Sequence, residues 1–211
     1  YASAPLKGVQ SLINYTKKPE PLEKGILRQK HNLSVYKDGT IRFDVTNTSL
    51  THFKPKQINT SVKKLKKLGY LEDMFGNPLT NDDQLLELFT QDIILPIEAK
   101  DFLENTANFI DELLTKFYKL DTVYNIKNKD DLVGNLVVGL APHTSVGIIG
   151  RIIGFTNAQV CFAHPYWHSA KRRDCDGDGD SILLLLDVLI NFSKDFLPEK
   201  IGGWMDAPLL L

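Results

Sequence analysis

Cysteine, net charge and long apolar runs are all scarce in this sequence. Only two cysteines occur among 211 residues, which excludes a disulfide-stapled scaffold and favours a reducing intracellular compartment. The 25 basic residues nearly balance the 26 acidic ones, so a uniformly basic nucleic-acid coat is excluded, although a local basic patch is not. With 43% hydrophobic and 24% charged residues, the composition predicts a soluble globular chain.

Targeting and membrane patterns are missing as well. The first ten residues, YASAPLKGVQ, have no basic segment followed by an apolar one. Residues 132–150 carry no charged side chain, but Pro142, His143 and several glycines interrupt them, which predicts buried strands rather than a membrane helix. We therefore expect no membrane association and a cytoplasmic location. Because the chain starts with Tyr and ends on three leucines, we also expect a piece of a longer polypeptide.

The pattern of apolar and turn residues divides the chain into three regions. Residues 1–25 hold three prolines and little periodicity, which predicts a linker or strap. For residues 26–130 we predict an accessory α/β segment, with a β-hairpin and a long helix. Residues 131–211 change to apolar β runs closely punctuated by glycine, and such glycines mark bends and close strand crossings in a small closed barrel. We therefore place a domain boundary near residue 130.

Two elements of the accessory segment have clear patterns. The arms Leu33–Tyr36 and Thr40–Val45 alternate apolar with polar residues on either side of Asp38-Gly39, which predicts a β-hairpin with a tight turn. From Glu98 to about Lys119, apolar residues recur at steps of three and four. This spacing predicts a long amphipathic helix.

A shorter helix is predicted after Thr60 and Ser61, either of which can cap it, and Gly69 ends it. Its polar face consists of four lysines: Lys63, Lys64, Lys66 and Lys67. Two interpretations stay open for this face. It is either an ordinary solvated surface or a surface that contacts nucleic-acid phosphates.

The strongest candidate for chemistry is an acidic run late in the chain. Asp174, Asp176, Asp178 and Asp180 alternate with small residues, so we expect a compact loop whose carboxylates converge. Two carboxylates about 4 Å apart repel by roughly 4 kcal/mol at an effective dielectric constant of 20, and a divalent cation removes that penalty. Because oxygen ligands select hard cations, we predict Mg²⁺ or Ca²⁺, with Mn²⁺ as a further candidate, over zinc or copper.

A structural calcium loop is the first alternative for this run. With Asp174 at position 1, the next two aspartates and Gly179 match the start of an EF-hand loop. The bidentate glutamate expected at position 12 is Leu185 here, so the ligand count is not met.

A zinc site is the second alternative, because four residues have suitable donors and spacing: Cys161, His164, His168 and Cys175. Each cysteine is single, whereas structural zinc sites more often pair cysteines two residues apart. We therefore expect no zinc in this chain.

A solvated acidic loop is the third alternative. Against it, the run is framed by three basic residues, Lys171, Arg172 and Arg173, on one side and by the apolar run Ile182–Leu186 on the other. The apolar run predicts a buried strand. Phosphoryl-transfer sites have such a frame, because cations attract the anionic substrate while carboxylates hold the metal.

The sequence around this run resembles the catalytic region of the large subunit of archaeal family D DNA polymerase. The resemblance is carried by HPYWHSAKRRDCDGDGD, by NLVVGLAPHTSVGIIGRIIGF before it and by LLLLDVLINFSKDFLPEKIGGWMDAPL after it. It extends upstream through EKGILRQKH, DGTIRFDVTNTSLTHFKPKQI and QDIILP, and so covers nearly the whole chain. The resemblance implies an α+β fold in which an accessory, clamp-like α/β segment precedes a double-psi β-barrel, partial or complete.

Multisubunit RNA polymerases share this barrel architecture, and their metal-binding signature is Asn-Ala-Asp-Phe-Asp-Gly-Asp. The resemblance places Asp176, Asp178 and Asp180 on the three metal-binding aspartates, which are also the implied catalytic residues. Asp174 falls on the Asn of that signature, which the polymerase family usually keeps. The family also has an acidic residue where this chain has Gly179, so Asp174 is a candidate additional ligand rather than an assigned one.

The implied function is DNA-directed DNA polymerisation, with two Mg²⁺ ions assisting nucleotidyl transfer during replication. Lys171, Arg172 and Arg173 are then candidates for contacts with the triphosphate or the DNA backbone, and ion pairing with neighbouring aspartates is their alternative role. The implied partners are primer–template DNA, deoxynucleoside triphosphates, a small exonuclease subunit that completes a heterodimer, and a sliding clamp.

Two further expectations concern what the chain does alone. The resembled family has a facing barrel with catalytic lysines, which this sequence does not show, so we expect no polymerase activity from the isolated chain. The alternative function is a noncatalytic, calcium-stabilised binding module.

Overall fold

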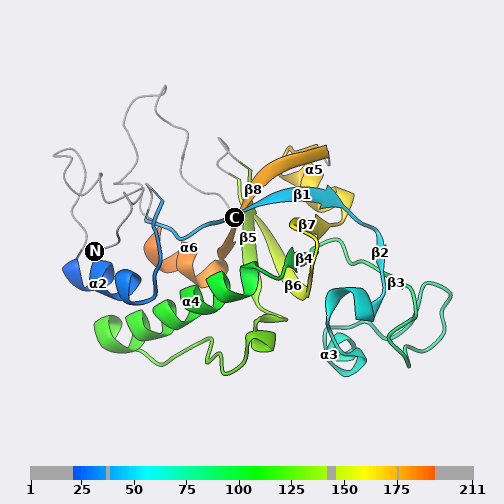
Figure 1. The fold of residues 1–211 in the computed structure, drawn as a ribbon, viewed down its shortest axis with the longest axis horizontal. Helices are drawn as coiled ribbons and strands as arrows, with labels where there is room; N and C mark the ends of the chain where they lie inside the picture. The colour runs from blue at the N-terminus through cyan, green and yellow to red at the C-terminus, as the bar shows by residue number, and fades with distance from the viewer. Residues whose placement is uncertain (1–20, 37–38, 142–145, 175, 193–211) are drawn as a thin grey trace.

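Six strands form a closed barrel in the computed structural model, which describes residues 21–36, 39–141, 146–174 and 176–192, with the main chain alone at Asp176. In barrel order the strands are β1 (Phe43–Ser49), β7 (Val160–Ala163), β4 (Asp92–Pro96), β6 (Ile148–Thr156), β5 (Leu136–Leu140) and β8 (Asp176–Leu184). The β1–β7 and β4–β6 pairs are parallel, and β8 closes the barrel by pairing antiparallel with β1 and β5. The predicted α+β class with a barrel is therefore confirmed (Figure 1), while the double-psi crossing stays a prediction.

Helices lie on both sides of this barrel in Figure 1. They are α2 (Leu22–Lys30), α3 (Val62–Lys67), α4 (Ala99–Glu112), α5 (Pro165–Ala170) and α6 (Leu185–Asn191), with a π-helical turn, η2 (Leu113–Tyr118), continuing α4. Short 3₁₀ turns, η1 (Pro55–Ile58) and η3 (Lys129–Leu132), and a two-stranded sheet of β2 (His52–Phe53) and β3 (Leu86–Glu87) complete the described elements. Within the described ranges, no helix is long and apolar enough to span a membrane.

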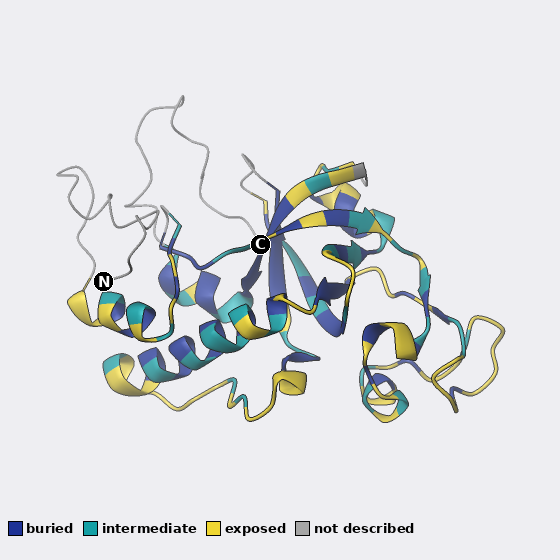
Figure 2. Cartoon of the chain, viewed as in Figure 1, coloured by how far each residue is buried: buried dark blue, intermediate teal, exposed yellow. Residues whose placement is uncertain are grey.

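Both predicted helices of the accessory segment are confirmed. The long helix forms as α4 and η2 together, and its buried side faces the barrel and α2 (Figure 2). The short helix forms as α3, where the Ser61 hydroxyl accepts a hydrogen bond from the Lys64 N–H at 3.3 Å. Leu65 is buried beneath it, which leaves the lysines on the outer side.

The predicted β-hairpin is wrong in its first arm. Leu33–Tyr36 form no strand, although the Tyr36 N–H donates a hydrogen bond to the Thr40 carbonyl at 2.8 Å. Leu33 and Val35 are buried against α4 and η2. The alternation of apolar and polar residues here therefore reflects packing on a helix, not pairing with another strand. Asp38 lies outside the described residues. The second arm starts later than expected, at Phe43 of β1, and pairs with β7 and β8.

The barrel also crosses the boundary that we expected near residue 130. Strands β1 and β4 come from the 26–130 segment, yet each pairs with two strands from the other side of that boundary. The apolar pattern of a strand shows that it is buried but not which strands it pairs with, so the sequence alone could not assign β1 and β4 to the barrel. The stretch 1–25 lies largely outside the described residues.

The chain between β1 and β4 forms a small lobe, in which Phe53, Leu65 and Leu79 are buried in one apolar cluster with Ile94 of β4 and Ile153 of β6. Several polar contacts join this lobe to the barrel. Asn59 and Thr60 donate hydrogen bonds to the carbonyls of Phe155 and Ile153 in β6, at 3.1 and 2.8 Å. Arg151 of β6 donates two hydrogen bonds of 2.8 Å to the carboxylate of Asp92, which also accepts one of 2.6 Å from the Tyr70 hydroxyl. The lobe containing α3 is thereby fixed to strands β4 and β6.

Two glycines predicted to mark close approaches do so. A Cβ on Gly139 of β5 would lie 2.3 Å from a ring carbon of Trp167, and one on Gly150 of β6 would lie 3.2 Å from the same ring. The indole of Trp167, carried by α5, fills the space left by both, and its Nε1–H donates a hydrogen bond to the Ile149 carbonyl at 3.2 Å. These glycines therefore let α5 pack closely against the barrel.

Candidate active site

The acidic run from Asp176 to Asp180 is the first half of strand β8 rather than the loop that we expected, and Asp174 lies before the strand. Its main chain pairs with β1, with Gly179 opposite Thr46 and Asp180 opposite Val45. The register shifts between Thr46 and Thr48, which leaves Asn47 at an irregularity beside the run. Gly177 has φ of +102°, a conformation that glycine adopts without the usual steric cost.

Strand geometry decides which aspartates act together. Side chains alternate across a strand, so Asp178 and Asp180 are on one face of β8. That face points inward at Asp180, because Val45 directly opposite belongs to the barrel core. Asp178 is partly exposed, and the Asp176 side chain lies outside the described atoms. Asp174 precedes the strand and is exposed, so it does not belong to the inward face of β8.

Asp180 is buried, and its two carboxylate oxygens differ in their surroundings. Oδ2 pairs with the Lys171 ammonium and accepts a hydrogen bond of 3.2 Å from the Asn47 side-chain amide. Oδ1 is also buried but has no hydrogen-bond partner among the described residues. Buried acceptors nearly always have a hydrogen-bond partner, so Oδ1 is an atom that could accept a hydrogen bond or bind a cation.

Lys171 does not face solvent. Its side chain is 0% exposed, and its Nζ lies 3.8 Å from the centroid of the Trp167 ring and 3.5 Å from Nδ1 of His168. Burial lowers the pKa of Lys171, while the charge of Asp180 acts in the opposite direction. An ammonium enclosed in this way can balance the charge of Asp180 but cannot reach a substrate from its present position.

The end of helix α5 determines where the three basic residues point. The Arg172 N–H donates to the Ser169 carbonyl at 2.9 Å and the Arg173 N–H to the His168 carbonyl at 3.2 Å, which is the Schellman pattern of helix termination. Arg172 takes the left-handed conformation that this pattern requires, with φ of +58°. As a result Lys171 is buried, Arg172 is exposed and Arg173 turns back to β8.

Arg173 lies across the acidic run. Its Nη2 donates a hydrogen bond of 2.7 Å to the Gly179 carbonyl, and its Nη1 lies 3.3 Å from Oδ2 of Asp178. Its Nε lies 3.5 Å from Oδ1 of Asp180 without hydrogen-bond geometry, so both of these buried atoms remain without a hydrogen-bond partner. The guanidinium therefore bridges two of the predicted metal ligands.

The residues of the zinc alternative have other contacts. Nδ1 of His164 accepts a hydrogen bond of 3.2 Å from the Tyr166 N–H and caps α5. Nε2 of His168 lies 3.1 Å from the Thr48 carbonyl, to which it donates, and burial together with the Lys171 charge lowers the pKa of His168. Burial raises the pKa of the Cys161 thiol to about 12. Cys175 lies outside the described residues.

The donors present suit the predicted metal in kind. Asp178 and Asp180 offer only oxygen, as Mg²⁺ prefers, and Oδ1 of Asp180 is the unpaired acceptor. Among the described side chains, which do not include that of Asp176, no cluster of three acidic, histidine or cysteine residues is close enough to hold a metal. Asn47 also belongs to this site, and no pattern in the sequence distinguished it, because its role comes from the pairing of β1 with β8.

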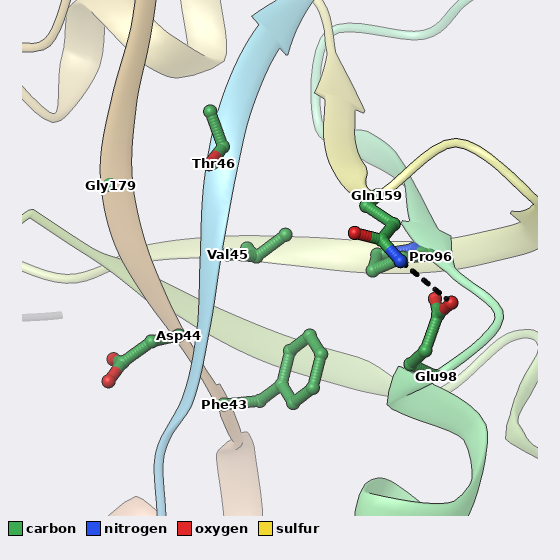
Figure 3. Close-up of a pocket in the computed structure, with 8 residues that line it drawn as sticks. All are labelled: Phe43, Asp44, Val45, Thr46, Pro96, Glu98, Gln159 and Gly179. Atoms are coloured by element: carbon green, nitrogen blue, oxygen red, sulfur yellow. Dashed lines mark hydrogen bonds between the residues drawn. The ribbon is translucent and has the colours of Figure 1, made fainter.

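A groove of about 430 Å³ lies nearby but is a different feature (Figure 3). It is lined by Phe43, Asp44, Val45, Thr46, Pro96, Glu98, Gln159 and Gly179. One hydrogen bond of 3.5 Å joins Gln159 to Glu98 at its edge. Neither Asp178 nor Asp180 is among the residues that line it.

This chain is a mixed barrel that carries Asp178 and Asp180 on its wall next to a basic turn, and sequence comparison identifies the family to which it belongs. Residues 1–211 match the family described as DNA polymerase II large subunit DP2, catalytic domain, and the chain belongs to that family. The resemblance stated from the sequence is therefore confirmed, and this chain is a fragment of the archaeal family D large-subunit type.

The similar proteins are archaeal DNA polymerase II large subunits. The chain is 57% identical over 206 residues to that of Archaeoglobus fulgidus, a match covering 98% of the chain and 18% of the relative. It is 56% identical over 211 residues to that of Pyrococcus furiosus, covering 100% and 17%, and 55% identical over 206 residues to that of Methanothermobacter thermautotrophicus, covering 98% and 19%. The chain thus spans less than a fifth of the length of these relatives.

Proposed function

We propose that this chain supplies the metal-binding half of a DNA polymerase active site, which extends a primer on a DNA template with deoxynucleoside triphosphates. The observation that carries the proposal is the face of β8 shared by Asp178 and Asp180, with one buried oxygen of Asp180 left without a hydrogen bond among the described residues. Membership of the polymerase family supports the reaction class.

In this proposal Asp176, Asp178 and Asp180 hold Mg²⁺ or Mn²⁺. Asp174 is a candidate for an outer contact because it is exposed beside them. The bound ions would acidify the primer 3′-hydroxyl and neutralise charge on the triphosphate. The inward face of β8 orients the carboxylates of Asp178 and Asp180, and Lys171 pairs with Asp180 on its enclosed side. We predicted from the sequence that Lys171, Arg172 and Arg173 contact the substrate. Because Lys171 is enclosed, we now propose these contacts for the two arginines alone.

The proposal extends to the rest of the enzyme. Transition-state charge in phosphoryl transfer requires positioned cations besides the metals, and we propose that a facing barrel of the large subunit supplies them. The small exonuclease subunit and the sliding clamp are the proposed protein partners, in the cytoplasm at the nucleoid. The isolated chain is then inactive.

The test uses the assembled polymerase with primed template, four deoxynucleotides and Mg²⁺. Asp178→Asn and Asp176→Asn should each reduce incorporation to background while duplex binding stays near normal, because the aspartates act on the transition state and basic residues provide affinity. Asp174→Asn, which also removes one charge, is the matched control and should retain activity. Near-normal incorporation by Asp178→Asn would overturn the proposal. Tight Ca²⁺ binding without any incorporation would favour the binding-module alternative instead.

A further inference from the structure

The two cations that contact Asp180 are held in very different ways. Lys171 is enclosed on one side of the carboxylate, whereas Arg173 lies across the other side, 23% exposed. We propose that Arg173 is a displaceable counter-cation of the aspartates, which leaves them when a divalent metal binds, while Lys171 remains paired with Asp180. This inference rests on the proposed function, because it takes Asp178 and Asp180 as metal ligands.

The contacts of Arg173 are loose ones for a guanidinium. Strong pairs between arginine and a carboxylate have two parallel hydrogen bonds of about 2.8 Å, as Arg151 has with Asp92. Arg173 instead approaches two different carboxylates, at 3.3 Å and 3.5 Å, and its Nε makes no hydrogen bond. Its hydrogen bond with good geometry is to a main-chain carbonyl, that of Gly179. Little interaction with the aspartates is therefore lost when this side chain moves.

Arg173 is also able to leave at little cost in solvation. Its side chain already reaches solvent, and a long arginine side chain can carry its charge into water while its stem stays in place. Lys171 has no such route, because its side chain is 0% exposed and is covered by Trp167. Separating Lys171 from Asp180 would leave two uncompensated buried charges.

The carboxylate oxygens divide in the same way. Oδ2 of Asp180 is taken by Lys171 and Asn47, on the enclosed side. Oδ1 of Asp180 and Oδ2 of Asp178 both face the guanidinium of Arg173. Departure of Arg173 would thus free oxygens of two aspartates together and leave the positioning contacts of Asp180 intact.

An arginine in this position has a physical purpose in the metal-free protein. Carboxylates held close together repel each other, and a bridging positive charge offsets that repulsion. The same charge competes with an incoming divalent cation, so its removal should strengthen metal binding. A fixed structural arginine would have the opposite effect, because its removal would disorder the ligands and weaken binding.

The experiment measures Mn²⁺ binding by electron paramagnetic resonance to the complete large subunit that carries these residues. The site of interest is the Mn²⁺ bound by the unmodified protein but not by Asp178→Asn. Arg173→Gln should lower the Kd of that site by about threefold to tenfold, because it removes one positive charge at contact distance. Arg172→Gln is the matched control, since it removes the same charge from the adjacent exposed residue, and should change the Kd by less than about twofold.

Thermal unfolding provides a second measurement. With metal removed by a chelator, Arg173→Gln should unfold at a lower temperature than the unmodified protein. Mn²⁺ should raise the unfolding temperature of the variant by more than it raises that of the unmodified protein. If Arg173→Gln does not fold, Arg173→Met serves instead, because it also removes the positive charge while keeping an unbranched side chain, and it should also bind Mn²⁺ more tightly. An unchanged or higher Kd in the folded variant overturns the inference and leaves the proposed function standing. Absence of any Asp178-dependent Mn²⁺ overturns the proposed function itself.

Discussion

Two basic clusters of this chain look alike in sequence but have opposite environments. In α3, Lys63, Lys66 and Lys67 are exposed, whereas Leu65 is buried. At the end of α5, Lys171 is buried while Arg172, the next residue, is exposed. A run of like charges therefore does not predict a shared environment, since the main chain determines where each side chain points.

The cause of the difference is local. Regular helix geometry gives α3 an apolar side and a basic side, so its lysine side chains point to solvent. At the end of α5 the left-handed Arg172 reverses the chain, and consecutive side chains diverge. The buried lysine is then stabilised by Asp180, a residue nine positions later that only the barrel brings into contact.

The largest expected effect is the loss of Lys171. Lys171→Met keeps the length of the side chain but leaves Asp180 as an unpaired buried charge, so the free energy of unfolding should fall by about 3–5 kcal/mol in urea denaturation. Lys66→Met in α3 is the control and should change it by less than about 0.5 kcal/mol. Similar losses for the two variants would break the comparison between the clusters.

A double variant sharpens this prediction. Adding Asp180→Leu to Lys171→Met removes both charges, so the double variant should be more stable than the sum of the two single effects predicts. Additive losses would show that the two side chains do not interact in the folded protein.

A slightly smaller loss of stability is expected when a side chain is added at Gly139, where the indole of Trp167 packs. Gly139→Ala would place a methyl group 2.3 Å from the indole that covers Lys171, so we expect a loss of about 3 kcal/mol from overpacking. Gly25→Ala in α2 meets nothing within 4 Å and should instead stabilise the protein by about 1 kcal/mol, as alanine does in helices. Urea denaturation of both variants measures the difference, and equal effects would contradict the close packing of α5 on β5.

The surroundings of Lys171 should also make stability depend on pH. Burial first, and the Lys171 charge second, lower the pKa of His168 below its ordinary 6.5. Below about pH 6.5 the unfolded chain binds a proton that the folded chain does not, so stability present above that pH is lost as the pH falls. Unfolding free energies at about pH 7.5 and 5.5 should differ less in His168→Asn than in the unmodified protein. An unchanged difference would rule out His168 as the titrating group.

The smallest expected effect concerns the turn that separates the three basic residues. Arg172 pays the steric cost of a left-handed conformation that glycine adopts freely, so Arg172→Gly should raise the free energy of unfolding by about 0.5–1 kcal/mol. Thermal unfolding measures the gain, and Ser169→Gly, within the regular part of α5, is a control that should lose stability. A loss for Arg172→Gly would mean that the arginine side chain makes contacts that outweigh the strain.

Several features of the fold could be predicted because they depend on neighbours in the chain. The 3.6-residue period predicted α3 and α4. The hairpin failed because Leu33 and Val35 alternate for a different reason, burial against α4 and η2. The boundary near residue 130 failed to separate the barrel because β1 and β4 find their partners far along the chain.

By itself, the sequence determined the family, the acidic run and the amphipathic elements, since motifs and periodicity are properties of adjacent residues. Only the tertiary structure decided that Lys171 is buried on Asp180, that Asn47 belongs to the site and that Arg173 bridges two aspartates. The physical reason is that burial and charge pairing depend on strand register and on the direction of one helical turn. These bring β1, α5 and β8 together at a single face.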